Sequence, residues 1–269
     1  MTFTKDEKLA TFIFFHNFLA QRIHMTQNQL VDYREAIEAR ISRRTYTNEP
    51  IAPEKIAYLQ SKILACNSEG GLTISWLEDG SKAFSALKSY GMFKNVGSIM
   101  VMKGPETTPD LFERVGYYGE LLVLEATALG LGTCWIAGTY DKNSDLFSLG
   151  ADENLVAVIS IGNVPTEQTM KEKLISRSVK RKTLPLKVFY TAEGNTPEWF
   201  VEGIKAVQKA PSAINSQRVR FNYVKDGITA STPGSWPTDP IDMGIAKLHF
   251  SLAAGGTFAF GLQGKFEKD

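Results

Sequence analysis

The sequence contains few of the residues on which disulfide frameworks and metal sites depend. It has 2 Cys and 3 His among 269 residues, and no close cluster of His, Cys and Asp occurs along the chain. Two cysteines cannot build a disulfide framework, and this sparing usage fits a reducing compartment. The composition therefore argues against a metal site and predicts a cytoplasmic protein.

The sequence also lacks an excess of either charge and any long hydrophobic run. Lys and Arg number 30 against 29 Asp and Glu, a net charge of +1. Nothing in this balance predicts a nucleic-acid surface. Residues 9–15 are apolar, but His16 and Asn17 interrupt them well short of a membrane span. The mixed charges of residues 5–8 differ from a secretory signal. We predict that residues 1–24 form an N-terminal extension and that the protein has no nucleic-acid or membrane partner.

From residue 30 onward the hydrophobic pattern predicts alternating helices and strands. Apolar residues at helical spacing predict helices over 31–41, from Pro53 to about Cys66, and over 116–129. Alternating or continuous apolar runs predict strands over 72–77, 97–102 and 155–161, the last a central strand. The chain is long enough for one large domain or for two small intertwined units.

The second half of the chain repeats this order of elements in shorter form. A helix begins at Pro197-Glu198 much as another begins at Pro53-Glu54, and each helix leads to a turn of small residues. A strand over 218–224 and a helix over 241–254 follow. The repeated order favours an internal duplication with a linker at 193–195. The alternative is the simple alternation that any α/β chain shows. The expected units are residues 25–192 and 193–269.

A compact candidate for anion binding follows the first predicted helix. Arg43 and Arg44 offer planar guanidinium groups suited to a phosphate or a ring carbonyl, and Thr45 adds a hydroxyl. The alternative is a basic helix end, where arginines interact favourably with the helix dipole.

A second candidate is the polar turn over residues 210–217, which follows a helical run. Pro211, Ser212, Asn215 and Gln217 form a turn that can offer amide and hydroxyl groups to a planar polar ligand. The alternative is a turn that only ends a helix.

The third candidate lies between Gly130 and Gly138. Gly130 fits a helix C-cap, whereas the glycines that follow allow the backbone to approach a ligand closely. Cys134 is interpreted as a packed thiol because no His lies near it in sequence. The segment is not a dinucleotide-binding fingerprint, since it follows a helix and lacks the third glycine and the downstream acid.

Together the Arg43 segment and the Pro211-Ser212-x-x-Asn215 turn resemble the signatures of the nitroreductase-like FMN flavoproteins. In ordinary members the arginines come first and the turn follows shortly after, whereas here they lie in opposite halves. This displacement resembles the single-chain, TM nitroreductase-type subgroup. It implies an α+β fold, a nitroreductase-like sandwich in which two related halves imitate the family's dimer. One chain would then bind one FMN between its halves and would not need a second chain.

The resemblance also implies which residues hold the FMN. Arg43, Arg44 and Thr45 would contact the phosphate or the ring edge, and a backbone N–H near Ala137 or Gly138 would approach flavin N5. The basic run that includes Lys180 and Arg181 is equally well read as a phosphate contact or as solvated charge. The full expected set is Arg43, Arg44, Thr45, Cys134, Trp135, Ile136, Ala137, Gly138, Lys180, Arg181, Pro211, Ser212, Asn215 and Gln217.

Two positions depart from the family pattern. Thr47 stands near where members often carry a basic residue, and Ala213 replaces a small polar residue of the turn. Each change removes one expected contact with the cofactor.

The chemistry implied by the resemblance is that of an oxidoreductase. NAD(P)H would deliver hydride to flavin N5 and leave, and a small electron-poor acceptor such as a nitroaromatic or quinone would then be reduced in the same place. No side chain is required as an acid or base, so no catalytic residue is expected. The two departures leave two alternatives: a non-catalytic FMN-binding protein (a redox sensor or flavin carrier), or a fold relative that binds no flavin.

Overall fold

The structure is a computed structural model that describes residues 31–84, 89–179 and 183–269. The expected N-terminal extension over 1–24 and the candidate residues Lys180 and Arg181 lie outside the described residues. Residues Tyr33–Asp269 form one compact unit, which is described by itself. None of the helices that the structure describes is long and apolar enough to cross a membrane.

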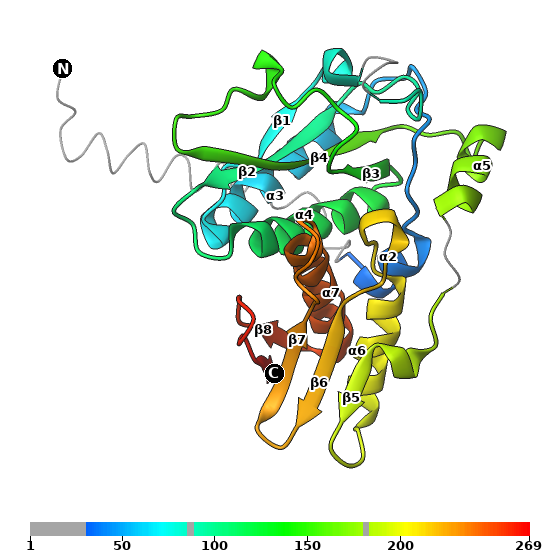
Figure 1. Cartoon of the computed structure of the whole chain (residues 1–269). Helices are drawn as coiled ribbons and strands as arrows, with labels where there is room; N and C mark the ends of the chain where they lie inside the picture. The colour runs from blue at the N-terminus through cyan, green and yellow to red at the C-terminus, as the bar shows by residue number, and fades with distance from the viewer. Residues whose placement is uncertain (1–30, 85–88, 180–182) are drawn as a thin grey trace, which may run out of the picture. The chain divides into compact units, whose positions relative to one another are not determined.

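The first half of the chain builds an antiparallel sheet with the strand order β1-β2-β4-β3 (Figure 1). These strands are β1 (Ser75–Leu77), β2 (Ile99–Pro105), β3 (Gly132–Ile136) and β4 (Glu153–Gly162). One face of β2 and β4 packs on α3 (Pro53–Gly70) and α4 (Leu111–Ala128), and the other face packs on the loops around Phe84 and Phe147. Both faces of β4 are covered, which explains its unbroken apolar sequence.

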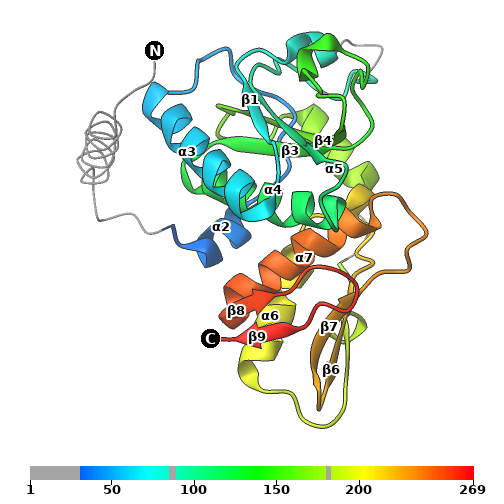
Figure 2. The same ribbon diagram turned by 90° about the vertical axis from the view of Figure 1, so that its left-hand side faces the viewer.

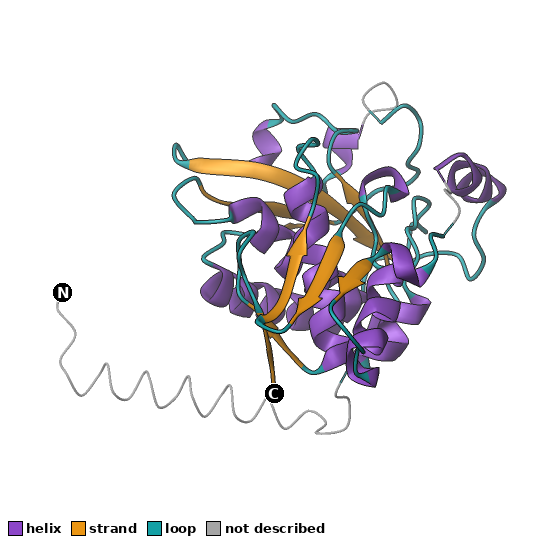
Figure 3. Cartoon of the chain, turned by 60° about the horizontal axis from the view of Figure 1, so that its bottom comes forward, coloured by secondary structure: helices purple, strands orange, loops and turns teal. Residues whose placement is uncertain are grey.

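A second sheet joins β5 (Tyr190–Ala192), β6 (Arg220–Val224) and β7 (Gly227–Ser231), with β5 parallel to β6 and β7 antiparallel to it. Figure 3 shows these strands side by side over helices. The sheet shares a core rich in phenylalanine with α6 (Glu198–Lys209) and α7 (Asp239–Ala254). The hairpin of β8 (Gly256–Phe258) and β9 (Phe266–Lys268) completes this core. Strand β5 belongs to this sheet although it precedes the linker expected at 193–195.

Helices α4 and α7, from opposite halves of the sequence, pack directly on each other (Figure 2). Glycines allow this close approach: a Cβ at Gly116 would lie 2.1 Å from the carbonyl oxygen of Ile241, and one at Gly244 1.9 Å from that of Glu113. No side chain fits between the two backbones at these points.

The α+β class predicted from the sequence is confirmed, and β4 is an interior strand as expected. Several boundaries differ, three of them as follows. Helix α2 (Tyr33–Ala39) ends before Ile41, α4 begins at Leu111 rather than 116, and β1 covers only the end of 72–77. Helix α5 (Met170–Val179) and strands β7 to β9 were not predicted. The remaining elements are 3-10 turns at Ser81–Phe84, Asp145–Phe147, Leu186–Val188 and Ala213–Asn215.

Candidate functional site

The Arg43 segment runs beside strand β3. Ser42 bridges to Thr133, and the N–H of Arg43 donates to the carbonyl of Thr133 at 2.8 Å. The hydroxyl of Tyr46 donates to the carbonyl of Arg43 at 2.9 Å, which holds the segment against the sheet. Because α2 ends at Ala39, the arginines do not lie in the last turn of that helix.

The guanidinium of Arg43 is directed into the protein. It is 6% exposed; its Nε lies 3.3 Å from a carboxylate oxygen of Glu172, and its Nη2 donates to the carbonyls of Pro165 (2.8 Å) and Glu167 (3.2 Å). These contacts give Arg43 an internal structural role. Its contact with a cofactor stays a prediction.

Glu172 fills the anion-binding position that the Arg43 segment creates. Its Oε1 accepts from the N–H of Arg44 (2.7 Å) and of Thr45 (3.0 Å), and its Oε2 accepts from the N–H of Thr169 (2.9 Å). Burial raises the pKa of this carboxyl, but the hydrogen bonds from these three N–H groups and the charge of Arg43 outweigh burial and hold the pKa below its usual value.

Sequence reasoning missed Glu172, although its local pattern is readable. The N–H of Glu172 lies 3.2 Å from the hydroxyl of Thr169, and the carboxylate reaches back to the N–H of Thr169. This reciprocal pair is a capping box at the start of α5. The pattern Thr-x-x-Glu predicts such a helix start, but not the contact with Arg43.

The neighbouring Arg44 is oriented differently. Its side chain is half-buried, and among the described residues its guanidinium has no hydrogen-bond or ion-pair partner. Its charge acts on Cys134: burial raises the pKa of that thiol, and Arg44 opposes the rise. Arg44 therefore lies near β3, and no described residue accepts a hydrogen bond from its guanidinium. The Thr45 hydroxyl is 3.4 Å from that of Thr169.

The chain reaches solvent in the two residues that follow strand β3. Cys134 and Ile136 are buried in the core, so Cys134 is the packed thiol that the sequence predicts. Trp135 is half-buried, and its indole Nε1 donates to Glu120 at 2.8 Å. Ala137 and Gly138 are exposed, and a Cβ at Gly138 would meet nothing within 4 Å. Their backbone is therefore open to a ligand.

The turn over 210–217 has a strained backbone. Ile214, Asn215 and Gln217 adopt left-handed conformations with φ of 47°, 54° and 53°. This conformation is costly for a β-branched residue such as Ile214, whose side chain is also 54% exposed. Strain of this kind persists where the surrounding structure enforces it, and it clusters at ligand-binding positions.

Asp242 on α7 enforces the turn. Both of its carboxylate oxygens accept from the N–H of Ala213 (3.0 and 3.1 Å), and the hydroxyl of Ser216 donates to one of them at 3.4 Å. Burial raises the pKa of Asp242 to about 7 against the opposing effect of these hydrogen bonds. Sequence reasoning missed Asp242, because nothing local links the first turn of α7 to residue 213.

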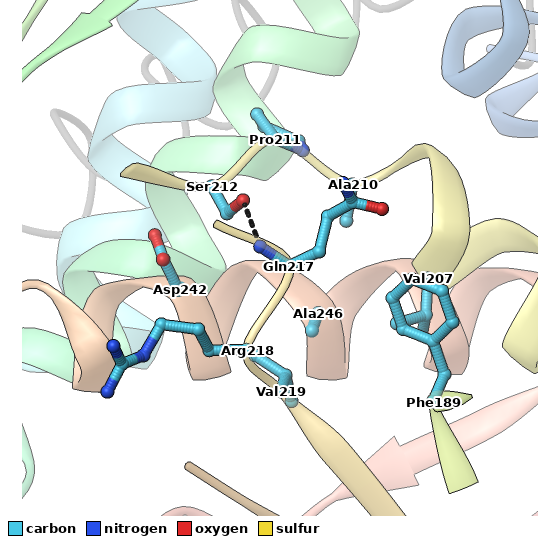
Figure 4. Close-up of a pocket in the computed structure, with 10 residues that line it drawn as sticks. All are labelled: Phe189, Val207, Ala210, Pro211, Ser212, Gln217, Arg218, Val219, Asp242 and Ala246. Atoms are coloured by element: carbon cyan, nitrogen blue, oxygen red, sulfur yellow. Dashed lines mark hydrogen bonds between the residues drawn. The ribbon is translucent and has the colours of Figure 1, made fainter. Parts of the chain in front are cut away.

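A pocket lies on the α7 side of this turn (Figure 4). Within it the Ser212 hydroxyl accepts from the N–H of Gln217 at 3.0 Å. The lining residues are Phe189, Val207, Ala210, Pro211, Ser212, Gln217, Arg218, Val219, Asp242 and Ala246. All of them lie between residues 189 and 246, so the pocket is formed by the turn and by the elements that pack against it, without the Arg43 segment or β3.

The ends of α2 and α6 bring the two motif segments together. Arg40 donates from Nη2 to the carbonyl of Lys209 at 3.4 Å, and Lys209 pairs with Glu38 at 2.6 Å. Arg40 is three positions before Arg43, and Lys209 is two before Pro211. Figure 1 shows α2 beside α6. The residues that precede the two motifs are therefore in contact, while a shared site for the motifs themselves stays a prediction.

Comparisons with known proteins identify the family and the fold. The family model described as "Putative TM nitroreductase" matches residues 32–254. The crystal structure of a nitroreductase from Thermotoga maritima MSB8 superposes with a TM-score of 0.58 at 21% identity, covering 90% of this chain and 94% of that one. This similarity shows a shared fold.

Other solved structures match about half of the chain. An "FMN-dependent Nitroreductase" from Clostridium difficile R20291 has 19% identity and a TM-score of 0.41, covering 55% of this chain and 98% of that one. An NADH dehydrogenase/NAD(P)H nitroreductase from Bacteroides thetaiotaomicron VPI-5482 has 18% identity and a TM-score of 0.42, covering 51% and 89%. No curated protein matches the chain. The family match spans most of the sequence and confirms the resemblance: the chain belongs to the "Putative TM nitroreductase" family.

Proposed function

We propose that the protein is an FMN-dependent oxidoreductase that uses NAD(P)H to reduce small electron-poor acceptors such as nitroaromatics or quinones. Family membership supports an oxidoreductase in general. The observation that supports the finer proposal is the contact between Arg40 and Lys209, 169 positions apart, which lie just before the Arg43 segment and the 210–217 turn. We call the region around this contact the seam.

The residues at this seam suit an FMN. A phosphate or ring carbonyl needs a cation with free donors, and the guanidinium of Arg44 has no partner among the described residues. The exposed backbone of Ala137 and Gly138 offers amide groups. In the strained turn the N–H of Asn215 donates to the carbonyl of Ser212 at 2.9 Å. We propose that these groups hold the cofactor. Arg43 would stabilise the segment through its buried ion pair with Glu172.

A bound flavin supplies the hydride chemistry, so the chain contributes binding and orientation. In this proposal Arg44 would balance negative charge on the phosphate or ring. The backbone N–H groups of Ala137 and Gly138 would donate to the cofactor, and the turn, fixed by Asp242, would supply further polar contacts. No side chain has to transfer a proton.

A second candidate function is FMN binding without turnover, as a redox sensor or flavin carrier. It is favoured first by the buried contacts of Arg43, which leave Arg44 to supply the positive charge of that segment. It is also favoured by Thr47 and Ala213, which stand where family members often have a basic or a polar residue.

The test begins with the absorbance of the purified protein in the flavin bands, before and after reconstitution with FMN. Steady-state NADH and NADPH oxidation is then followed with menadione and with a nitroarene. Flavin with turnover supports the enzyme, and flavin without turnover supports the second candidate. A protein that remains colourless after reconstitution would overturn both.

A further inference from the structure

Glu120 on α4 is a fully buried carboxylate whose partners come from three other segments. Its Oε2 accepts from the indole Nε1 of Trp135 on β3 at 2.8 Å. Its Oε1 lies 2.9 Å from Nε2 of His249 on α7 and 3.6 Å from Nε of Arg40, just beyond α2. None of these contacts was predicted from the sequence, because the partners lie far apart along the chain.

His249 is also fully buried, and its hydrogen bonds define where protons must be. Its Nδ1 lies 3.1 Å from the carbonyl oxygen of Ala206 on α6. A carbonyl oxygen carries no proton, so Nδ1 must be the donor. The contact between Nε2 and Glu120 therefore requires one proton shared by the pair. With that proton in place, every polar atom of the imidazole is satisfied.

The residues that contact Glu120 or His249 lie a few positions before one or another part of the candidate site. Trp135 is followed two positions later by the exposed Ala137. Arg40 precedes Arg43 by three positions and also donates to the carbonyl of Lys209, next to the 210–217 turn. Ala206 lies on α6, which leads to the same turn. A single buried carboxylate thus connects the three segments that meet at the seam.

We propose that Glu120, held by His249, is a positioning residue that sets the spacing of these three segments and thereby the affinity for FMN. This inference rests on the proposed function for the identity of the ligand. The alternative is that Glu120 is an ordinary buried ion-pair partner that contributes only to stability.

The chain offers a matched control for that alternative. Glu113 and Lys247 form a buried pair at 2.5 Å between the same two helices, α4 and α7. Their remaining contacts run to Ala259 and Gly261 in the C-terminal hairpin, away from the three segments. Loss of Glu113 should therefore cost stability without disturbing the seam.

The experiment compares Glu120→Ala, Glu120→Gln and Glu113→Ala. FMN affinity is measured by fluorescence titration, unfolding by denaturant, and amide hydrogen exchange is measured in the FMN-free protein over 40–45, 135–138 and 210–217. We expect Glu120→Ala to weaken FMN binding about tenfold or more, because it leaves buried donors without an acceptor, and to raise exchange in all three segments. Glu113→Ala should leave both properties unchanged.

Glu120→Gln tests the geometry itself. The amide oxygen can accept from Trp135 while the amide nitrogen donates to Nε2 of a neutral His249, so these two links are kept, whereas the negative charge opposite Arg40 is lost. We expect this variant to keep the low exchange over 135–138, to raise exchange over 40–45, and to bind FMN with an affinity between those of the wild type and Glu120→Ala. If Glu120→Ala does not fold, Trp135→Phe takes its place, since it removes the indole donor and part of the ring but leaves Glu120 and His249 in place, and it should raise exchange over 135–138 and weaken binding.

The inference is overturned if Glu120→Ala binds FMN normally with unchanged exchange in the three segments, or if Glu113→Ala disturbs them equally. In place of an unfolded Glu120→Ala, a Trp135→Phe variant with normal affinity and exchange overturns it as well. Failure of the wild-type protein to bind FMN refutes the proposed function instead. The exchange comparison between Glu120→Ala and Glu113→Ala then still decides whether Glu120 positions the seam.

Discussion

Asp242 is a buried residue whose protonation affects the geometry of an exposed turn. It accepts from Ala213 and Ser216 at the base of the strained segment, and burial raises its pKa to about 7. The carboxyl therefore changes charge near neutral pH. Because the left-handed Ile214 and Asn215 depend on this anchor, the turn should depend on pH over the same range.

The pH dependence of stability follows from the sign of this shift. The folded pKa lies above the unfolded value of about 3.9, so the native state binds the proton more tightly. The resulting stabilisation is complete below about pH 4 and is lost as the pH rises through about 7, at about 1.4 kcal/mol per unit of pKa difference. Asp242→Asn cannot titrate. We expect denaturant unfolding to show a variant that gains stability relative to the wild type between pH 5 and pH 8. An equal difference at both values would contradict this assignment.

Arg43 and Arg44 are adjacent in sequence, but the structure separates their roles. Arg43→Ala leaves the buried Glu172 without its ion-pair partner and should lower the melting temperature of the FMN-free protein. Arg44→Ala should leave that temperature nearly unchanged but weaken FMN binding by ~1.5–3 kcal/mol, typical of a charge-assisted hydrogen bond. Thermal melts and FMN titrations of both variants check this. The reverse assignment would be indicated if Arg43→Ala melted normally and lost the cofactor.

At the scale of elements, α5 is attached through a buried carboxylate, Glu172, together with a hydrogen bond from Lys171 to the carbonyl of Gly91. Glu172 is 1% exposed, whereas Met170 and Leu174 on the same helix are 74% and 62% exposed. This reverses the usual amphipathic rule, in which apolar residues face the core. The helix is therefore held mainly by hydrogen bonds to the Arg43 segment.

Glu172→Ala should release α5. Removal of the carboxylate leaves the N–H groups of Arg44, Thr45 and Thr169 without their acceptor and removes the capping box. We expect faster proteolysis and hydrogen exchange over 165–179, while the core exchanges as in the wild type. Glu167→Ala is the control, since its side chain is 85% exposed and its ion pair with Lys173 is long at 3.5 Å. Equal exchange in both variants would show that packing holds α5.

The same reversal explains which elements the sequence could predict. Pro53 at its start predicts helix α3. An apolar run that reflects burial on both faces predicts strand β4. Helix α5 exposes Met170 and Leu174, so the hydrophobic pattern does not reveal it. The motif segments are recognisable locally, but their supports are not: Glu172 is 129 positions from Arg43, and Asp242 is 29 from Ala213.

At the scale of the whole molecule, the crossing of α4 and α7 joins the first half of the sequence to the second. Gly244→Ala would place a Cβ 1.9 Å from the backbone oxygen of Glu113, and backbone cannot give way as a side chain can. We expect a loss of about 3 kcal/mol or more in the free energy of unfolding. Gly97→Ala, where a Cβ meets nothing within 4 Å, should change it little. A near-normal Gly244→Ala would mean that the two helices can separate without cost.

The asymmetry of the two halves determines how many cofactors one chain should bind. The first half has Arg43-Arg44-Thr45 but no Pro-Ser-x-x-Asn turn, and the second half has the turn but no counterpart of the arginines. We therefore propose one FMN per chain in a monomeric protein, with Arg44 and Asn215 acting on the same ligand. Heat-released flavin should approach a ratio of one to protein, and sedimentation should give a monomer that retains it. Arg44→Ala and Asn215→Leu should then be non-additive in FMN affinity, because both act through one ligand. A ratio near two would mean that both halves form a competent site and that the asymmetry argument is wrong. Strict additivity with full flavin retained in Asn215→Leu would mean that the turn lies outside the cofactor site and that the two halves do not share one.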